Sequence, residues 1–484
     1  MHKRFVANIV SRLLSIACFA LFAPLGLAWY DNPHSQETKA FFITIVLGLA
    51  FSGCLILIFR PKKEDFKRIN ARDGLAIVGL SWVLLSLFGA IPLFLSHVGS
   101  GYADAFFEIT SGFTTTGASV FRDVESLPRG ILLWRGLTQW LGGMGIVVLF
   151  IAILPALGIN TAQLYQSETS GIAFEKLEPR IKEMARNLWV IYLILTVAEV
   201  IFLVAGKMPF FDALCHAFAT VATGGFSTKN MSIGAYGAYI QWVVVVFMFL
   251  SGINFALHYA AIHGNVRAYF KDEEFKFYFY LIFGLTIISA LVLVKTGLSE
   301  SPLRDAAFSL VSIFSSTGFA TADYDRWPDS LRLFLLMGMV TGACAGSTSG
   351  GLKMIRLYLT GKLASVSLIQ AGYPNAVIPL KLNGQSLENK TIMDVVTFFV
   401  IYVHIWIVGG ILFAFFESCD IPTALSAAAA CLSNVGPGLN KVGAIQNYAW
   451  VSIPGKWLLS FLMLAGRLEL YAILILFVPS TWKK

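Results

Sequence analysis

The sequence predicts an all-α polytopic membrane protein in which four tandem helix–pore loop–helix repeats surround one pore in a pseudo-fourfold arrangement, after an N-terminal two-helix hairpin. Hydrophobic residues make up 57% of the 484 residues and charged residues only 13%, against about 25% in soluble domains. Mean hydropathy is +0.72, and ten apolar stretches approach the ~20 residues that cross a bilayer as a helix. A short motif also occurs four times between such stretches.

The apolar stretches are the candidate membrane spans. They lie at 8–30, 40–60, 75–97, 131–157, 188–206, 238–262, 277–295, 331–341 continuing past 352, 393–416 and 456–478. The first stretch follows Met1-His2-Lys3-Arg4 and is longer than the apolar part of a signal peptide. We therefore interpret it as a retained helix, and we expect the eighth span to be interrupted.

Basic residues predict the orientation of the spans. If the ten spans cross the membrane one after another, the basic segments all lie on the same side of it. The positive-inside rule assigns that side, which also holds both termini, to the cytoplasm. These segments are Lys3-Arg4, Arg60 to Arg68, Lys176 to Arg186, Arg267 to Lys276, Lys353 to Lys390 and Lys483-Lys484. The net charge of +8 therefore reflects membrane orientation. No basic stripe with interleaved aromatic residues indicates nucleic-acid binding.

The repeated motif is a helix start followed thirteen residues later by a glycine in a turn of small and polar residues. Its copies run from Asp104 to Gly117, Asp212 to Gly225, Asp305 to Gly318 and Thr423 to Gly436. One chain can surround a pore with equivalent oxygen-rich turns only by repetition. Non-helical backbone at membrane depth also needs protein or water to satisfy its amides. Close packing of small residues explains any single copy, and the constant spacing of four copies favours the pore.

The repeats divide the chain into an N-terminal hairpin and four pore units. The hairpin covers 1–60, and the units cover 74–157, 187–264, 276–370 and 391–480. The connections 160–186 and 370–391 are expected on the cytoplasmic side.

Each motif copy predicts a re-entrant helix. Its opening Asp or Thr is expected to be the N-cap. About eleven helical residues then cover ~16 Å. The negative end of the helix dipole points to the membrane centre, where it favours a cation. In the second copy either Gly224 or Gly225 could be the glycine that corresponds to Gly117, Gly318 and Gly436. The count from Asp212 selects Gly225, as does the match of Gly225-Phe226-Ser227-Thr228 to Gly318-Phe319-Ala320-Thr321.

The turns have the chemistry of a monovalent-cation site. Backbone carbonyls can replace the water around a dehydrated cation, and glycine allows the dihedral angles that this requires. Thr116 and Thr317 can each add a hydroxyl oxygen. The turns contain no Asp or Glu, unlike the carboxylate rings of many divalent-cation pores.

The turns TTTGAS, TGGFST, STGFAT and SNVGPG, set in four helix–pore–helix repeats after an extra hairpin, resemble the Trk/Ktr/HKT superfamily of potassium transporters over essentially the whole chain. The resemblance is strongest to its bacterial TrkH branch. It implies potassium uptake, with rubidium also accepted, across the bacterial inner membrane. In that family the four glycines correspond to the first glycine of the TVGYG potassium-channel filter. In that family, glycine at this position of the first repeat is associated with a preference for potassium, whereas serine at the same position favours sodium in some plant members.

The resemblance implies a filter made by the four turns. Its candidate residues are Thr115, Thr116, Gly117, Gly224, Gly225, Thr317, Gly318, Asn434, Val435 and Gly436. All of these except Thr115 and Asn434 are assigned as direct potassium ligands. The fourth turn departs most from TVGYG, because Asn434-Val435 precedes its glycine and Pro437 follows it. We therefore expect looser discrimination than in a symmetric potassium channel.

The eighth span is interrupted between Thr341 and Lys353 by small residues that include four glycines. Each glycine costs a helix about 1 kcal/mol, so a loop is expected at membrane depth. The resemblance implies that this loop is a gate beneath the filter. Its candidate gate residues are Gly342, Gly346, Ser347, Thr348, Gly350 and Gly351. The alternative interpretation is that these small residues only allow neighbouring helices to pack closely.

Charged residues inside spans suggest function because burying them is costly. Arg467 lies in the last span, and Glu469 is off its helix face. The resemblance implies that Arg467 faces the pore and limits permeation, with a snorkelling arginine as the alternative. Glu108 and His216 each lie four residues after the Asp that opens their motif copy. We expect their side chains either to form hydrogen bonds behind the filter or to find polar partners elsewhere in the core. Only the third repeat is expected to break its second helix.

The leading hypothesis is a gated potassium-conducting pore, and the alternative is a secondary transporter that couples potassium entry to protons or sodium. An enzyme is not predicted, because metalloprotease, serine-hydrolase and dinucleotide-binding motifs are missing. The resemblance implies a homodimer on a cytosolic TrkA-type subunit that binds NAD, ATP or ADP, with no cofactor in this chain. Its expected docking surface is 160–186, 264–276 and 353–391.

Overall fold

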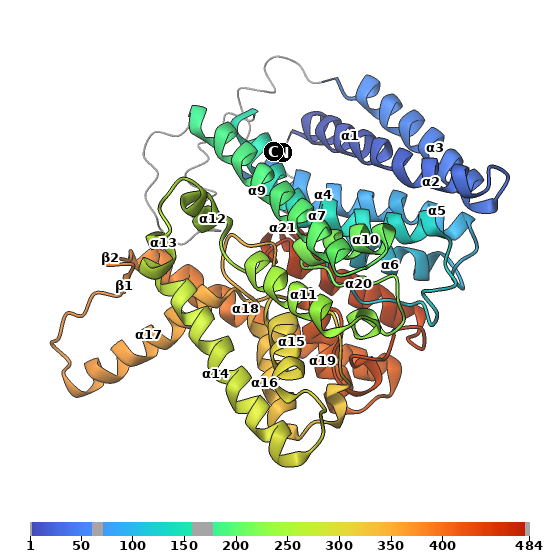
Figure 1. The fold of residues 1–484 in the computed structure, drawn as a ribbon. Helices are drawn as coiled ribbons and strands as arrows, with labels where there is room; N and C mark the ends of the chain where they lie inside the picture. The colour runs from blue at the N-terminus through green and yellow to red at the C-terminus, as the bar shows by residue number, and fades with distance from the viewer. Residues whose placement is uncertain (1, 61–70, 157–177, 480–484) are drawn as a thin grey trace.

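The computed structural model describes residues 2–60, 71–156 and 178–479, and these ranges are almost entirely helical (Figure 1). Parts of three predicted cytoplasmic segments lie outside these ranges, namely most of Arg60 to Arg68, most of 160–186 and Lys483-Lys484. The only strands in the described ranges, β1 (Lys381–Leu382) and β2 (Gln385–Ser386), form a small antiparallel hairpin.

The N-terminal part of the chain is a helical hairpin that packs beside the first motif copy. Its helices are α1 (Lys3–Ala20), α2 (Phe22–Asp31) and α3 (Gln36–Ile58). Ser35 caps α3, since its hydroxyl accepts the Thr38 amide at 3.1 Å. Helix α1 packs against both α3 and α4, so the hairpin covers one side of the helical body (Figure 1).

The remaining helices follow in the order long helix, short buried helix, second helix. Around the first two copies they are α4 (Ala71–Gly89), α5 (Ile91–Leu95), α6 (Tyr102–Phe113), α7 (Arg129–Ala156), α9 (Glu178–Ala205), α10 (Phe210–Val221), η2 (Ser232–Ala235), α11 (Ala238–Ser251), α12 (Phe255–Ile262) and α13 (Arg267–Lys271). Around the last two copies they are α14 (Glu273–Thr296), α15 (Pro302–Phe314), η3 (Tyr324–Arg326), α16 (Asp329–Thr341), α17 (Met354–Gly372), α18 (Asn389–Glu417), α19 (Ile421–Leu432), η4 (Asn440–Val442), α20 (Ile453–Arg467), α21 (Tyr471–Leu474) and η5 (Ile475–Phe477).

Six helices or continuous helix pairs in the described ranges are long and apolar enough to cross a membrane, and two bent pairs raise this number to eight. The ten predicted spans include these eight. The other two fall on α7, whose side chains after Gly145 are outside the described part of the structure, and on α16, which has only 13 residues. Helix α16 is short because the glycine-containing loop that follows it ends the helix.

The short helices α6, α10, α15 and α19 form the centre of the molecule. Each has 12 or 13 residues and is mostly buried. Each also packs against the second helix of the preceding copy, in the pairs α6 with α20, α10 with α7, α15 with α11 and α19 with α16. Because the fourth copy thereby contacts the first, the four copies close into a ring.

The predicted N-caps of the short helices were wrong by three or four residues. Asp104, Asp212 and Asp305 lie inside the first turn, and Asp420, not Thr423, caps α19. Prolines explain the earlier start in three of these helices, because a proline before or within the first turn presets the backbone dihedral. The aspartates still lie at the positive end of each helix dipole.

The expectation that only one second helix breaks was also wrong. Helices α11 and α12 bend by 99°, and α20 bends by 117° against the segment α21–η5. Asn254 makes the first bend, because its side chain caps α12 at the Ala256 amide. At the second bend Glu469 and Leu470 have left-handed backbones. Neither break was visible in the sequence, because each stays within a largely apolar stretch.

The C-terminal ends of α18 and α14 offer a matched test of helix capping. Ser418 follows α18 in the left-handed region, whereas Gly297 takes the equivalent place after α14. We expect Ser418→Gly to stabilise the protein by about 1 kcal/mol and Gly297→Ala to destabilise it by a similar amount, because only glycine adopts this conformation without strain. Thermal denaturation in detergent measures both. Shifts of the same sign would contradict this account.

Candidate functional site

The four motif turns share one backbone conformation. The glycines have positive φ angles of 83°, 76°, 83° and 95° at Gly117, Gly225, Gly318 and Gly436. The residues two positions earlier are also left-handed, with φ of 52°, 54°, 55° and 56° at Thr115, Thr223, Ser316 and Asn434. Gly224 is not left-handed, so the two adjacent glycines differ structurally and Gly225 takes the repeated position.

The four turns pack against one another in a closed ring. Each glycine lies against the carbonyl of the residue that precedes the glycine in the next turn. The contacts are Gly117 with the Gly224 carbonyl, Gly225 with Thr317, Gly318 with Val435 and Gly436 with Thr116. A β carbon at any of these glycines would overlap the carbonyl, so only glycine fits. Four equivalent carbonyl-bearing turns therefore surround one axis.

Hydroxyl and amide side chains brace the ring. The Thr116 hydroxyl is 2.8 Å from the Thr114 hydroxyl, and the Thr317 hydroxyl is 2.7 Å from that of Ser315. The Asn434 side chain donates to the Thr116 hydroxyl at 3.0 Å and to the Met463 carbonyl at 2.9 Å. The residue that makes the fourth turn unlike the others therefore joins it to the first turn.

Gln139 of α7 contacts the second motif turn, and the sequence analysis missed it. Its side-chain amide donates to the Gly224 carbonyl at 2.5 Å and accepts from the Phe226 amide at 3.1 Å. These contacts fix the backbone on both sides of Gly225. No signal in the sequence marks Gln139, because it lies in an apolar span far from the second motif copy.

Glu108 and His216 both lie behind the turns. The Glu108 carboxylate accepts from the Ser119 hydroxyl at 3.0 Å and the Val120 amide at 2.9 Å. His216 is 2.9 Å from the Ser227 hydroxyl and 2.7 Å from the Asp212 carbonyl. Both side chains therefore hold the extended segment that follows their own glycine, which is the first of the two alternatives that the sequence left open.

Arg135 of α7 neutralises Glu108 and joins two copies. Its Nε donates to the Glu108 carboxylate at 2.8 Å, and its Nη1 donates to the Ser227 carbonyl at 3.2 Å. The guanidinium also lies 4.1 Å from the centre of the Phe226 ring. Arg135 is 2% exposed, so this ion pair is buried. The sequence analysis missed Arg135 as well.

A cavity of about 190 Å³ opens over the ring, and all four glycines line it. No carboxylate belongs to the described residues of its lining. Tyr448 closes one side of this mouth, since its hydroxyl donates to the Gly436 carbonyl at 2.8 Å and its amide donates to the Ser119 carbonyl at 2.8 Å. Arg122, Arg135 and Lys229 belong to the same lining, so basic side chains at the mouth accompany the neutral oxygens of the ring.

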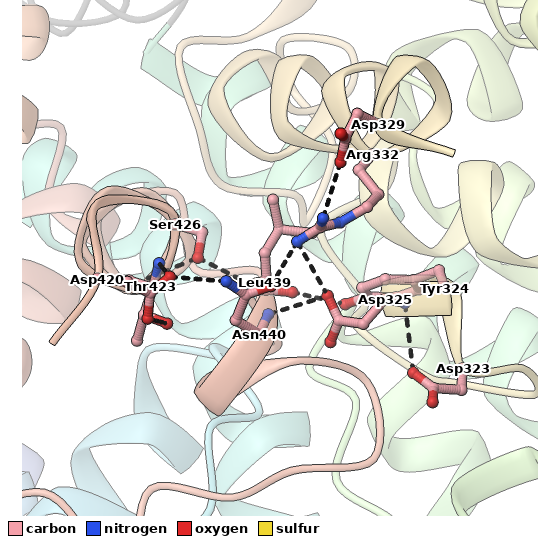
Figure 2. Close-up of polar contacts among 11 residues, drawn as sticks. Asp323, Tyr324, Asp325, Asp329, Arg332, Asp420, Thr423, Ser426, Leu439 and Asn440 are labelled. Atoms are coloured by element: carbon pink, nitrogen blue, oxygen red, sulfur yellow. Dashed lines mark hydrogen bonds and ion pairs between the residues drawn. The ribbon is translucent and has the colours of Figure 1, made fainter. Parts of the chain in front are cut away.

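A polar network supports the chain that follows Gly436 (Figure 2). Its centre is Asn440, whose amide donates to Asp325 at 2.9 Å and whose side chain donates to Asp420 at 2.6 Å and accepts from Arg332. Burial raises the pKa of Asp420, but hydrogen bonds from Thr423 and Asn440 outweigh it, and the net pKa lies below its usual value. Asp420 thus stays ionised at neutral pH and ties this segment to the start of α19, while Asp325 and Arg332 tie it to η3 and α16.

The loop that interrupts the eighth span lies directly under the turns. The Gly350 amide donates to the Ser316 hydroxyl at 2.8 Å, and Gly350 packs against Ser433 and Asn434. The Thr348 hydroxyl donates to the Val221 carbonyl at 3.1 Å, at the end of α10. The loop therefore contacts the second, third and fourth copies.

The other loop residues shape its path. Gly342, Gly346 and Gly351 have φ of 71°, 72° and 83°, so they provide three left-handed positions. The Gly346 carbonyl accepts the Phe255 amide at 3.0 Å, and the Ser347 hydroxyl donates to the Cys344 carbonyl at 2.6 Å. The loop is thereby tied to the break between α11 and α12.

Arg467 ends α20 and points into the protein. Its Nη1 donates to the Thr348 carbonyl at 2.7 Å, and its Nη2 donates to the Gly142 carbonyl at 2.8 Å and the Gly143 carbonyl at 3.2 Å. Arg467 is only 6% exposed, which argues against the snorkelling alternative. It bridges the loop of the third copy and the second helix of the first.

The fold and the site define a helical, multi-pass membrane transporter and not an enzyme. A model of the TrkH family, described as a cation transport protein, matches residues 37–484. The chain therefore belongs to the TrkH family of cation transport proteins.

Relatives and a solved structure match the full chain. The Trk system potassium uptake protein TrkH of Salmonella typhimurium is 37% identical over 493 residues, which cover 100% of both chains. The Trk system potassium uptake protein TrkG of Escherichia coli K12 is 33% identical over 488 residues, covering 100% of this chain and 99% of the relative. The crystal structure of the potassium transporter TrkH from Vibrio parahaemolyticus matches with a TM-score of 0.88 and 35% identity over 100% of both chains. The predicted fold class and family resemblance are confirmed.

The buried pair of Glu108 and Arg135 gives a stability prediction. We expect Arg135→Met to destabilise the protein by about 3 kcal/mol, because it leaves a buried carboxylate without its partner. Adding Glu108→Gln removes that charge and should restore part of the loss. Thermal denaturation of Arg135→Met, Glu108→Gln and the double variant in detergent checks this, and a double variant that is destabilised by the sum of the two single effects would contradict it.

Proposed function

We propose that this chain takes up potassium across the bacterial inner membrane, with both termini in the cytoplasm and the ring of four turns as its selectivity filter. The observation that carries the proposal is the closed ring of glycine–carbonyl contacts. It brings neutral backbone oxygens from all four copies to one axis, which suits a dehydrated monovalent cation. The four short helices end at this ring, and their negative dipole ends favour a cation there. The potassium uptake proteins similar to the chain support the same ion.

In this proposal potassium binds at Thr116, Gly117, Gly224, Gly225, Thr317, Gly318, Val435 and Gly436, with Thr115 and Asn434 completing the filter. Rubidium is carried as well. The Thr116 and Thr317 hydroxyls have hydrogen-bond partners within their own turns, so backbone carbonyls carry most of the coordination. The filter lies within four pore units at 74–157, 187–264, 276–370 and 391–480, preceded by the hairpin 1–60.

The loop and Arg467 form the proposed gate. Gly342, Gly346, Ser347, Thr348, Gly350 and Gly351 provide the loop, which lies on the side of the ring opposite the mouth. Arg467 adds a positive charge at the same level and fixes the loop through the Thr348 carbonyl. A fixed positive charge on the pathway opposes cation passage, and movement of the loop away from Arg467 opens it.

The proposed assembly is a homodimer on a cytosolic TrkA-type subunit that binds NAD, ATP or ADP. The chain itself binds no cofactor and no nucleic acid in this proposal. Segments 160–186, 264–276 and 353–391 form the docking surface. Helix α17 and the hairpin β1–β2 extend from the helical body in Figure 1, which suits this role.

A secondary transporter that couples potassium entry to protons or sodium is the second candidate. One observation favours proton coupling: Glu199 of α9 is fully buried, and among the described residues it has no ion-pair partner and only the Thr220 hydroxyl as a hydrogen-bonding neighbour. Flux measured in liposomes at imposed voltages, with and without a proton or sodium gradient, separates the two candidates. Uptake that follows the potassium gradient and voltage alone supports the pore.

Gly117→Ser tests the filter. The added side chain would overlap the Gly224 carbonyl, and residue 117 has a positive φ that serine adopts only with strain. We therefore expect rubidium uptake by potassium-starved cells to fall and the preference for potassium over sodium to weaken. Gly101→Ser is the control, because Gly101 begins the same helix and a β carbon there meets nothing within 4 Å. Unchanged uptake and selectivity in Gly117→Ser would remove the filter assignment.

Deleting residues 346–349 tests the gate. The deletion removes the Thr348 carbonyl that Arg467 contacts, so we expect basal rubidium flux to rise several-fold. The control is Gly53→Ala in α3 of the N-terminal hairpin, where an added β carbon meets nothing within 4 Å, and it should leave basal flux unchanged. Wild-type flux in the folded 346–349 deletion variant would exclude the loop as a gate.

A further inference from the structure

Glu274, in the first turn of α14, contacts both ends of the loop beneath the turns. Its Oε1 accepts the Ala345 amide at 2.7 Å and the Ile355 amide at 3.0 Å. Ala345 lies at the start of the loop and Ile355 lies just after it, in the first turn of α17. Glu274 is 6% exposed, so water cannot readily replace these bonds. One carboxylate oxygen therefore draws two points ten residues apart to the same place.

Helix α17 has no capping side chain of its own. Its N-cap residue is Lys353, whose side chain makes no cap hydrogen bond and whose backbone is left-handed with φ of 72°. The first amides of a helix need acceptors, and a negative charge near them is favourable. Glu274 supplies both from another helix. The start of α17, and with it the end of the loop, thus depends on a residue of α14.

The first turn of α14 is itself fixed on the side away from the turns. Asp272 caps α14 by accepting the Phe275 amide at 2.7 Å, and Asn383 of the β1–β2 hairpin accepts the Glu273 amide at 2.8 Å. The Glu273 carboxylate accepts from Tyr358 at 2.9 Å and from Lys362 at 2.5 Å, both on α17. The hairpin, α17 and α14 therefore meet in one polar cluster around Glu274.

We propose that Glu274 is the positioning residue that holds the loop closed, and that it links the loop to the hairpin β1–β2 and α17. The inference rests on the proposed role of the loop as a gate. When Glu274 holds Ala345 and Ile355, the intervening residues stay under the filter with Thr348 against Arg467. A displacement of α17 or the hairpin relative to α14 breaks these bonds and releases both ends of the loop together.

The test compares Glu274→Met and Glu274→Ala with the control Glu300→Gln in the full chain reconstituted in liposomes. Methionine is about as long as glutamate but has no oxygen to accept the two amides, and Glu300 is an exposed acidic residue beyond the other end of α14. We expect basal rubidium flux to rise about tenfold in both Glu274 variants, because the closed population loses its anchor. The ratio of rubidium to sodium flux should stay at the wild-type value, since the filter is not touched. Glu300→Gln should conduct like the wild type.

A double variant separates positioning of the loop from a general loss of structure. In the chain that lacks residues 346–349, Glu274→Met should add no further flux, because the segment that Glu274 holds is gone. Wild-type basal flux in a folded Glu274→Met variant, or an equal rise in Glu300→Gln, would overturn the proposal. If Glu274→Ala does not fold, Glu274→Met alone decides, because it keeps the length of the side chain.

Failure of this proposal is distinguishable from failure of the gate. If the deletion of 346–349 raises flux and the Glu274 variants do not, the loop is a gate that another residue holds. If the deletion leaves flux unchanged, the gate assignment is wrong whatever the Glu274 variants do. A Glu274 variant that lowers rubidium flux and changes ion preference also overturns the proposal, because the carboxylate then acts on the filter.

Discussion

The contact of each motif glycine with a carbonyl of the next turn is the constraint on which the rest of the structure depends. Four such contacts close a ring, so no turn can shift without its neighbours. The ring forces a left-handed backbone at each glycine and places the ends of α6, α10, α15 and α19 at one point. The outer helices follow from this, because each short helix must be covered by two helices of its own copy and one of the preceding copy.

Side chains from neighbouring copies hold the ring from behind. Gln139 and Arg135 both come from α7 of the first copy, and both reach the turn of the second. Asn434 of the fourth turn reaches the first. Each donates its side-chain N–H groups to oxygens inside an apolar protein, where an unpaired donor is costly. Hydrogen bonds between copies therefore hold the backbone of the ring in place.

Beneath the ring the symmetry is lost, and regulation becomes possible there. Three of the second helices break, but only the third contains a long loop, and only the fourth ends in an arginine that reaches across the axis. Arg467 and Glu274 hold the loop from opposite sides, through the Thr348 carbonyl and through two backbone amides. Backbone contacts of this kind fix position without requiring particular loop side chains, which suits a segment made of small residues.

The sequence by itself determined the helical membrane class, the four motif copies and the position of Gly225, because hydropathy and spacing are local and periodic. It placed the N-caps three or four residues late and missed the bends after Ser251 and Arg467, because those depend on capping and on left-handed residues within apolar stretches. Only the tertiary structure brought Arg135, Gln139 and Glu274 to the ring and the loop. Their partners lie 27 to 92 residues away in sequence, and no pattern within a single segment encodes such contacts.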